Sequence, residues 1–147
     1  MHSGKCVDNS HGDPTNGNPI QQWDCAAPRT SNLTNQQWYF DWTDDGWARI
    51  RNVATGKCLN VQGGSRADTA PVIQWTCGGA GGNDEWKGEY LFTRTNTKTH
   101  VAFDVYRLKA RHSLKCLDVV GADSADGARL QQYTCLAGAA NQQETWF

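Results

Sequence analysis

The stretch SGKCVDNS, residues 3–10, returns twice along the chain, as TGKCLNVQ from Thr55 and as SLKCLDVV from Ser113. Each copy contributes one cysteine, and a second cysteine follows it after 19 residues every time. Successive copies begin 52 and 58 residues apart, which lies near the period of several repeat architectures. The sequence therefore predicts one structural unit used three times.

The constant cysteine spacing favours one disulfide inside each repeat, although six cysteines allow 15 pairings in principle. Metal binding is the alternative, but the chain has no CxxC and its histidines show no ligand spacing. We therefore expect no metal site and no cofactor. The expected pairs are Cys6–Cys25, Cys58–Cys77 and Cys116–Cys135.

Short aromatic or β-branched segments, separated by Gly, Asn, Asp and Pro, predict an all-β protein of many short strands. The segments are WARIRN, KCLNVQ, APVIQW, EYLFTR, VAFDVYRL and RLQQYT. A length of 147 residues with 38 % hydrophobic residues fits one domain over residues 1–147. We expect its repeats near 1–42, 43–92 and 93–147, and call them the first, second and third repeats.

Charge and hydropathy exclude several kinds of partner. A formal net charge of −1 without a block of like charges argues against nucleic acid. No apolar run approaches the roughly 20 residues of a membrane span, and MHSGKC has no apolar signal-peptide region. Because six cysteines in a small chain favour an oxidising compartment, we expect a secreted, extracellular protein whose export signal lies outside this sequence.

Two further phrases recur in register with the cysteines. IQQWDC, VIQWTC and LQQYTC place an aromatic residue two positions before the second cysteine, namely Trp23, Trp75 and Tyr133. NQQWYF, NDEWKG and NQQETWF each carry a later tryptophan, namely Trp38, Trp86 and Trp146. We expect the first three aromatics to form pocket walls and the three tryptophans to belong to the core.

These phrases together resemble the ricin B-type lectins and the family 13 carbohydrate-binding modules, and the resemblance covers nearly the whole chain. It implies a β-trefoil, in which three repeats of four strands surround a pseudo-threefold axis. It also implies up to three shallow sugar pockets. The recurring residue types suit a saccharide, because an aromatic ring packs on its apolar C–H face and polar side chains meet its hydroxyls.

The resemblance places the sugar-binding residues unevenly among the repeats. In the first repeat they are Asp8, Gln21, Trp23, Asn35 and Gln36. In the third repeat they are Asp118, Gln131 and Tyr133, followed by Asn141 and Gln142. Two extra residues before Trp146 leave open whether Gln143 and Glu144 take the places of that last pair.

The second repeat departs from the pattern, because Asn60 stands where the others have a carboxylate and Ile73 where they have a glutamine. Trp75 and Asn83 remain, with Asp84 in place of glutamine. Loss of a charge-assisted hydrogen bond removes about 1.5–3 kcal/mol. We expect this pocket to be weak or silent.

Both ends of the chain depart from the trefoil pattern. Only MHSGKC precedes the first phrase, so one strand is expected to be clipped, leaving an edge open to strand exchange with another chain. The connection over residues 87–104 is the alternative means of filling that gap. NLT from Asn32 matches a glycosylation acceptor and equally fits a plain polar loop.

The expected function is non-catalytic binding of galactose-like or xylan/arabinan-type saccharides. The chain would act as a lectin, or target a glycan-active enzyme as a module of a larger secreted protein with a catalytic domain. A glycoside hydrolase needs two facing carboxylates, whereas Asp8 and Asp118 lie in separate repeats. The alternative is a protein-binding β-trefoil without sugar affinity.

Overall fold

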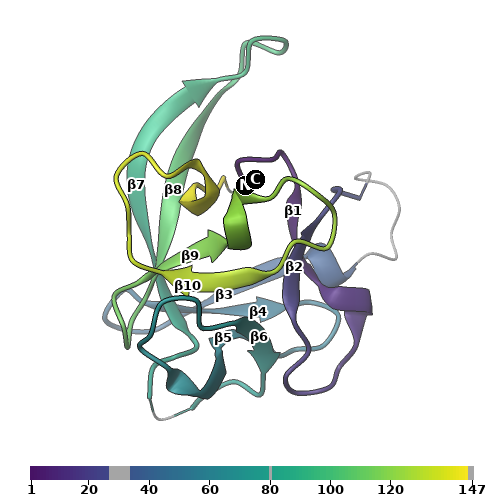
Figure 1. The fold of residues 1–147 in the computed structure, drawn as a ribbon, viewed down its shortest axis with the longest axis vertical. Coiled ribbons are helices and arrows are strands. Elements are labelled where there is room, and N and C mark those ends of the chain that lie inside the picture. The colour runs from purple at the N-terminus through teal and green to yellow at the C-terminus, as the bar shows by residue number, and fades with distance from the viewer. Residues whose placement is uncertain (27–33, 80, 146–147) are drawn as a thin grey trace.

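Ten strands and five short 3-10 turns make up the computed structural model, which describes residues 1–26, 34–79 and 81–145 and has no α-helix in them (Figure 1). The strands are β1 (Cys6–Asn9), β2 (Ile20–Trp23), β3 (Trp38–Trp42), β4 (Ala48–Asn52), β5 (Cys58–Val61), β6 (Val72–Trp75), β7 (Glu85–Thr95), β8 (Ala102–Ala110), β9 (Cys116–Val119) and β10 (Leu130–Tyr133). The turns are η1 (Ser10–Gly12), η2 (Thr34–Gln36), η3 (Gln62–Gly64), η4 (Val120–Ala122) and η5 (Ala140–Gln142). The predicted all-β class is confirmed, and each of the six predicted segments contains a strand.

Each repeated phrase forms the same hairpin. Its first cysteine opens a strand, a 3-10 turn follows, and the strand that ends in the aromatic residue returns antiparallel to it as β1–β2, β5–β6 and β9–β10. Three isolated bridges join the returning strands in a cycle: Pro19 with Ile73, Pro71 with Gln131, and Gln21 with Arg129. The hairpins therefore surround an approximate threefold axis.

Two further hairpins, β3–β4 and β7–β8, link the repeats. The larger sheet has the order β10-β9-β8-β7-β4-β5-β6, with β3 on β4, while β1 and β2 form a separate pair. The connection over 87–104 lies in β7–β8, which projects beyond the rest of the molecule (Figure 1). The idea that it fills the gap beside β1 is wrong, because β7 pairs with β4 and β8 and not with β1.

The three disulfides link the predicted cysteines, and all six cysteines are used. Each bridge closes a loop of 19 residues within one repeat. Closing a loop of this length contributes about 3 kcal/mol in the chain-entropy account. The bridges therefore fix each hairpin at its base but do not join one repeat to another.

Apolar side chains from all three repeats meet on the axis. Ile20, Val72 and Leu130 hold equivalent positions and are at most 1 % exposed. Trp86 is buried and Trp38 packs against the same cluster, as predicted, and their indole N–H groups donate to the backbone oxygens of Leu59 and Val7 at 2.9 Å. The third expected core tryptophan, Trp146, lies outside the described residues.

Three fully buried glutamines tie neighbouring repeats together. The side-chain amide of Gln22 donates to the backbone oxygens of Asp123 and Ala125 at 2.8 and 2.9 Å, and its oxygen accepts from Ser3 Oγ at 2.8 Å. A loop of the third repeat is thus held by a strand of the first.

Gln74 and Gln132 repeat this arrangement one step further around the axis. Gln74 Nε2 donates to the backbone oxygens of Asp13 and Thr15. Gln132 Nε2 donates to those of Ser65 and Ala67 at 2.7 Å each, and its oxygen accepts from Ser113 Oγ at 2.8 Å. The three contacts form a closed ring, in which each repeat supplies one glutamine to a loop of a neighbouring repeat.

A carboxylate stands where the third core tryptophan was expected. Trp86 pairs with Ala48, which lies 10 residues before Cys58. Glu144 pairs with Tyr106, which lies 10 residues before Cys116. Glu144 is therefore the equivalent of Trp86 in the third repeat. Glu144 is buried, and burial raises its pKa to about 7, although the Met1 ammonium 3.5 Å away opposes this change. Its Oε1 has no hydrogen-bond partner among the described residues.

The Gln132→Leu substitution tests the ring of glutamines. It keeps the side chain's size but removes the amide that donates to the Ser65 and Ala67 carbonyls and accepts from Ser113 Oγ. Although His112 Nε2 remains 2.9 Å from the Ser65 oxygen, we expect the free energy of unfolding to fall by about 2–5 kcal/mol in urea titrations. Gln62→Leu, at an exposed glutamine, is the matched control. A loss below about 1 kcal/mol for Gln132→Leu would contradict the assigned role.

The Glu144→Gln substitution tests the buried carboxyl. Its raised pKa means that the folded state keeps a proton that the unfolded state loses above about pH 4.5, so stability should fall by about 3 kcal/mol as the pH rises to 7. Unfolding measured from pH 5 to pH 8 should show this fall in the parent protein and lose it in Glu144→Gln. Asp44→Asn, which removes an exposed carboxyl, should keep the fall. A parent protein with no such fall would refute the assignment.

Candidate functional site

A cavity of about 220 Å³ opens beside the β1–β2 hairpin and η2. It gathers all five residues that the sequence predicts for the first repeat. Its lining residues are Asp8, His11, Gln21, Trp23, Asp24, Asn35 and Gln36. Side chains from two strands and a turn that are up to 28 positions apart thus meet around one hollow.

The Asp8 carboxylate organises this cavity. It is 3 % exposed and accepts three side-chain amide hydrogen bonds, from Gln21 at 3.0 Å, Asn35 at 2.8 Å and Gln36 at 2.9 Å. Gln21 lies beside it because these residues are opposite each other in the β1–β2 register. Asp8 thereby fixes the direction of all three amides.

An exposed aromatic ring forms one wall. Trp23 is 43 % exposed, and a Cβ placed on Gly127 of the third repeat would lie 3.8 Å from its ring. Gly17 is placed in the same way against Trp75, which is 45 % exposed. Each of these walls is therefore built where two repeats meet.

Sequence reasoning missed His11 and Asp24 in this cavity. His11 has a φ of 57°, at a position where the other repeats have Gly63 and Gly121 at 63°. A side chain in place of glycine in a left-handed turn was the available signal. His11 Nδ1 lies 2.9 Å from Ser10 Oγ, and Asp24 is ion-paired with Lys5.

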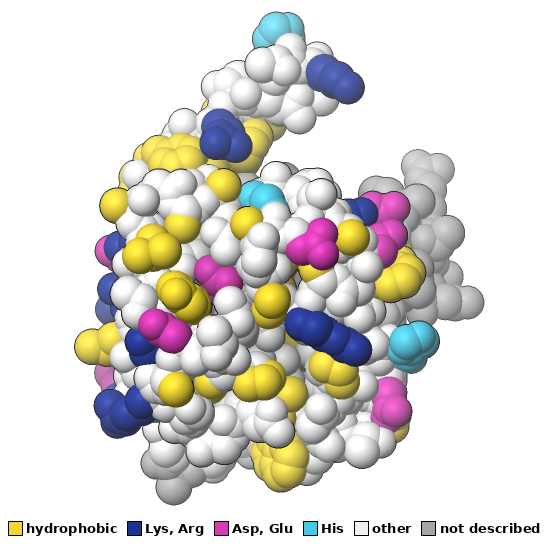
Figure 2. Space-filling view, in the orientation of Figure 1, with side chains coloured by type: hydrophobic (Ala, Val, Ile, Leu, Met, Phe, Trp, Pro, Cys, Tyr) yellow, Lys and Arg dark blue, Asp and Glu magenta, His cyan; other side chains and the backbone are white. Residues whose placement is uncertain are grey.

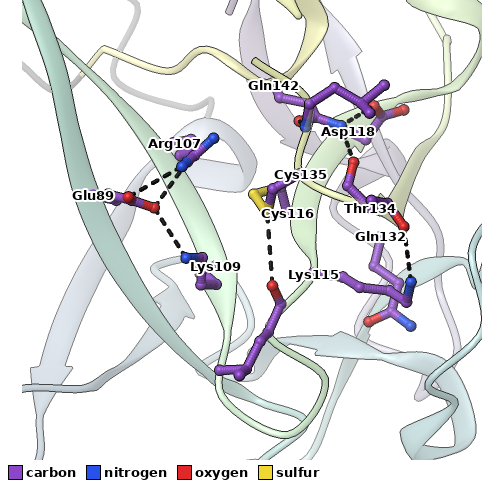
Figure 3. The surroundings of a disulfide bond; sticks show 12 residues. Glu89, Arg107, Lys109, Lys115, Cys116, Asp118, Gln132, Thr134, Cys135 and Gln142 are labelled. Atoms are coloured by element: carbon purple, nitrogen blue, oxygen red, sulfur yellow. Dashed lines mark hydrogen bonds and ion pairs between the residues drawn. A yellow bond between two sulfur atoms is a disulfide. The ribbon is translucent and has the colours of Figure 1, made fainter.

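The third repeat reproduces the carboxylate arrangement, and Figure 3 shows one of its hydrogen bonds, between Gln142 and Asp118. Asp118 accepts from Gln131 at 2.9 Å, Asn141 at 2.9 Å and Gln142 at 3.0 Å. The open question of register is thus answered in favour of Asn141 and Gln142, not Gln143 and Glu144. Tyr133 is half-buried, at the place that Trp23 holds in the first repeat.

The second repeat keeps the backbone but changes the polar groups. Asn60 accepts one amide hydrogen bond, from Asn83 at 3.0 Å, and Ile73 has no polar atom to offer in its side chain. The carboxylate now stands at Asp84, whose Oδ2 accepts from the Gly78 N–H at 2.7 Å and from Arg49 Nε at 3.3 Å. This carboxylate is fully buried and its charge is met by arginine.

The described part of the chain has neither a cluster of metal-binding side chains nor a helix that could span a membrane. Its His, Cys, Asp and Glu side chains form no group of three or more that could hold a metal ion. None of its helices is long and apolar enough to cross a membrane.

The comparison with protein families gives one match. The family described as ricin-type beta-trefoil lectin domain-like matches residues 34–133 and 92–146. No curated protein sequence matches the chain.

Solved structures extend this result. ThreeFoil, a designed threefold-symmetric protein, is 33 % identical with a TM-score of 0.78, over 97 % of this chain and 89 % of that one. The exo-beta-1,3-galactanase 1,3Gal43A from Clostridium thermocellum is 28 % identical with a TM-score of 0.76, over 98 % of this chain and 28 % of that one. An earthworm R-type lectin C-half, solved with GalNAc, is 16 % identical with a TM-score of 0.68, over 98 % and 91 %. The predicted β-trefoil is confirmed.

Alanine substitutions at two equivalent positions test the role of the carboxylate. Asp118→Ala leaves three amides without their shared acceptor, so we expect a loss of about 2–4 kcal/mol in unfolding free energy. Asn60→Ala removes the acceptor of one amide and should cost about 1 kcal/mol. Equal losses, measured by urea unfolding, would show that the carboxylate does not organise its pocket.

Proposed function

Because this chain belongs to the ricin-type β-trefoil lectin domain-like family, we propose that it binds saccharides without catalysis through the pockets of its first and third repeats. The observation that carries the proposal is the first cavity, where a carboxylate aligns three amides opposite an exposed tryptophan. The proposed sugar-binding residues are those predicted from the sequence, with His11 and Asp24 added at the rim of the first pocket.

The chemistry of that cavity suits a pyranose. Trp23 offers a flat apolar surface to the C–H face of the ring, and its exposure means that stacking removes this surface from water. Gln21 offers an amide N–H, and Asn35 an amide oxygen, on side chains already oriented by Asp8, so little side-chain entropy remains to be lost on binding. Gln36 supports this arrangement, because it donates to Asp8 and to the Asp24 carbonyl and accepts from the Ala26 N–H. A shallow site of this kind binds with a Kd of about 0.1–1 mM.

A galactose-like saccharide, or a xylan- or arabinan-type chain, is the ligand class that we propose. The galactanase with a similar domain acts on a galactan, and the earthworm lectin was solved with GalNAc, which supports the galactose-like choice. This chain spans about a quarter of the galactanase. A place in a larger secreted glycan-active protein is part of the proposal.

We propose that the second pocket is weak or silent. Trp75 still offers an aromatic ring, but Asn60 accepts from one amide where Asp8 accepts from three. The carboxylate of this repeat, Asp84, is bound by Arg49. If the first and third pockets bind the same polysaccharide chain, the second binding event is intramolecular and benefits from a high effective concentration. Polysaccharides should therefore bind more tightly than single sugars.

Substitution of the aromatic residue at the same position of each repeat tests these assignments without removing residues of the hydrophobic core. We expect Trp23→Ala and Tyr133→Ala each to weaken binding of a galactose-bearing or xylan-type polysaccharide about tenfold, through loss of stacking and of one arm of bivalent binding. Trp75→Ala is the matched control and should change affinity less than twofold. Isothermal titration on a panel of such polysaccharides gives the affinities, and urea unfolding checks each variant's stability.

Two outcomes would oppose the proposal. Equal losses from all three substitutions would show that the second pocket works as well as the others. Absence of binding to every saccharide in the panel by the oxidised, folded protein would favour the protein-binding β-trefoil instead.

A further inference from the structure

The β7–β8 hairpin is much longer than its counterpart β3–β4. Its strands contain 11 and 9 residues, against 5 and 5 in β3–β4. Farther out along the hairpin than the bridge between Tyr106 and Glu144, the two strands pair only with each other among the described residues. The outer part therefore leaves the body of the molecule and is open to solvent on both sides (Figure 1).

The end of this hairpin has an unusual charge balance. Residues 94–101 contain Arg94, Lys98 and His100 and no acidic residue. The projection in Figure 2 shows Lys, Arg and His side chains and no Asp or Glu on the face in view. Seven of the 13 Lys and Arg side chains in the described ranges form ion pairs with carboxylates, and Arg94 and Lys98 are among the six that form none there. The seven are Lys5, Arg49, Arg51, Arg107, Lys109, Arg111 and Lys115.

One face of the hairpin combines this charge with aromatic rings. Arg94 pairs across the strands with Phe103, and its guanidinium lies 5.5 Å from the ring centre of Phe92. The nearby Asp104 belongs to the opposite face, where it accepts from Thr93 Oγ1 at 2.7 Å. Phe92 and Phe103 are half-buried and so keep part of their rings available.

The same face continues toward the body with a cluster of charges (Figure 3). Glu89 accepts from Arg107 at 2.8 Å and lies 3.1 Å from Lys109, and these two cations lower its pKa to about 2. One ionised carboxylate therefore meets two cations, and Lys87 lies opposite Lys109. The face carries net positive charge from its base to its end, although the whole chain has a net charge of −1.

The turn at the end of the hairpin is held by its own hydrogen bonds. Asn96 Oδ1 accepts from the backbone N–H groups of Lys98 and Thr99 at 2.8 and 3.1 Å. The Asn96 backbone N–H donates to the Val101 oxygen at 2.9 Å. This turn presents Lys98 on a defined backbone, which lowers the entropy cost of binding through it.

The base of the hairpin adjoins the pocket of the third repeat. Gln142 donates to Asp118 inside that pocket, and Glu144, two residues later, pairs with Tyr106 of β8. A polymer bound in the proposed third pocket would therefore reach the cationic end of the hairpin by extending outward along β8. Uronic acids place carboxylates along polysaccharides whose sugar rings also offer apolar C–H faces, and guanidinium and aromatic groups suit these two features respectively.

We propose that the β7–β8 hairpin is a second contact surface that selects acidic polysaccharides, with Arg94 and Lys98 binding uronate carboxylates while a neighbouring sugar occupies the third pocket. This inference rests on the proposed saccharide binding and adds a ligand class to it. Salt should weaken the hairpin's contribution and leave the pockets' contribution nearly unchanged, because exposed charges are screened and stacking is not.

The test compares one acidic polysaccharide, such as glucuronoxylan, with the same material after its carboxyl groups have been reduced to alcohols. We expect the protein to bind the acidic form about threefold to tenfold more tightly, with the preference falling as salt rises. Arg94→Gln/Lys98→Gln should abolish the preference and keep the affinity for the reduced form. Arg66→Gln/Arg129→Gln, which removes two exposed cations away from the hairpin, should keep the preference.

The outcomes separate this inference from the proposed function. Binding of both forms with equal affinity would overturn the hairpin's role and leave the sugar pockets standing, as would equal effects of the two double variants. Binding of the acidic form alone, unaffected by Trp23→Ala and Tyr133→Ala, would overturn the pockets instead. If the hairpin variant lost binding only to phosphatidylserine vesicles, its surface would belong to a membrane and our inference would be wrong.

Discussion

The ring of buried glutamines is the constraint on which the rest of this trefoil depends. Gln22, Gln74 and Gln132 each donate to two backbone carbonyls of a neighbouring repeat, and the loss of these bonds would leave buried polar groups incompletely paired. The clasped loops also support the pocket walls, since Gly127 backs Trp23 and Gly17 backs Trp75. A binding pocket in this molecule is consequently a property of two adjacent repeats.

On this shared frame, small changes in sequence alter the polar groups around each candidate pocket. The first and third repeats keep a carboxylate that collects three amides, while the second moves its negative charge to Asp84 beside Arg49. The fold tolerates this exchange because the Asp84 carboxylate still accepts a backbone N–H, from Gly78, as the Gln142 side chain accepts one from Leu136. The hydrogen bond to the backbone survives in the second repeat, whereas the carboxylate that collects three amides is absent there.

Residues that recur in register with the cysteines were predictable from the sequence. The disulfides, the strand pairs and the places of Asp8, Gln21 and Trp23 all follow from the threefold repetition. Departures from it were not predictable. Glu144 replaces a core tryptophan because the pocket requires Asn141 and Gln142 in their places, and this is visible only in space. The length of the β7–β8 hairpin was visible in the sequence but its outward course was not, and the His11 side chain departs from the glycines at the equivalent positions of the other repeats.

The disulfides join residues close in sequence, whereas the buried glutamines bond to residues far away in sequence, and this difference has a kinetic consequence. Every disulfide closes within 19 residues, so it can form as soon as its own repeat has been synthesised. The contact of Gln22 with Asp123 spans 101 residues and must wait for the last repeat. Long-range closure of this kind is slow. Oxidation would therefore run ahead of assembly, and a nascent chain with all its bridges in place would still have its final closure to make.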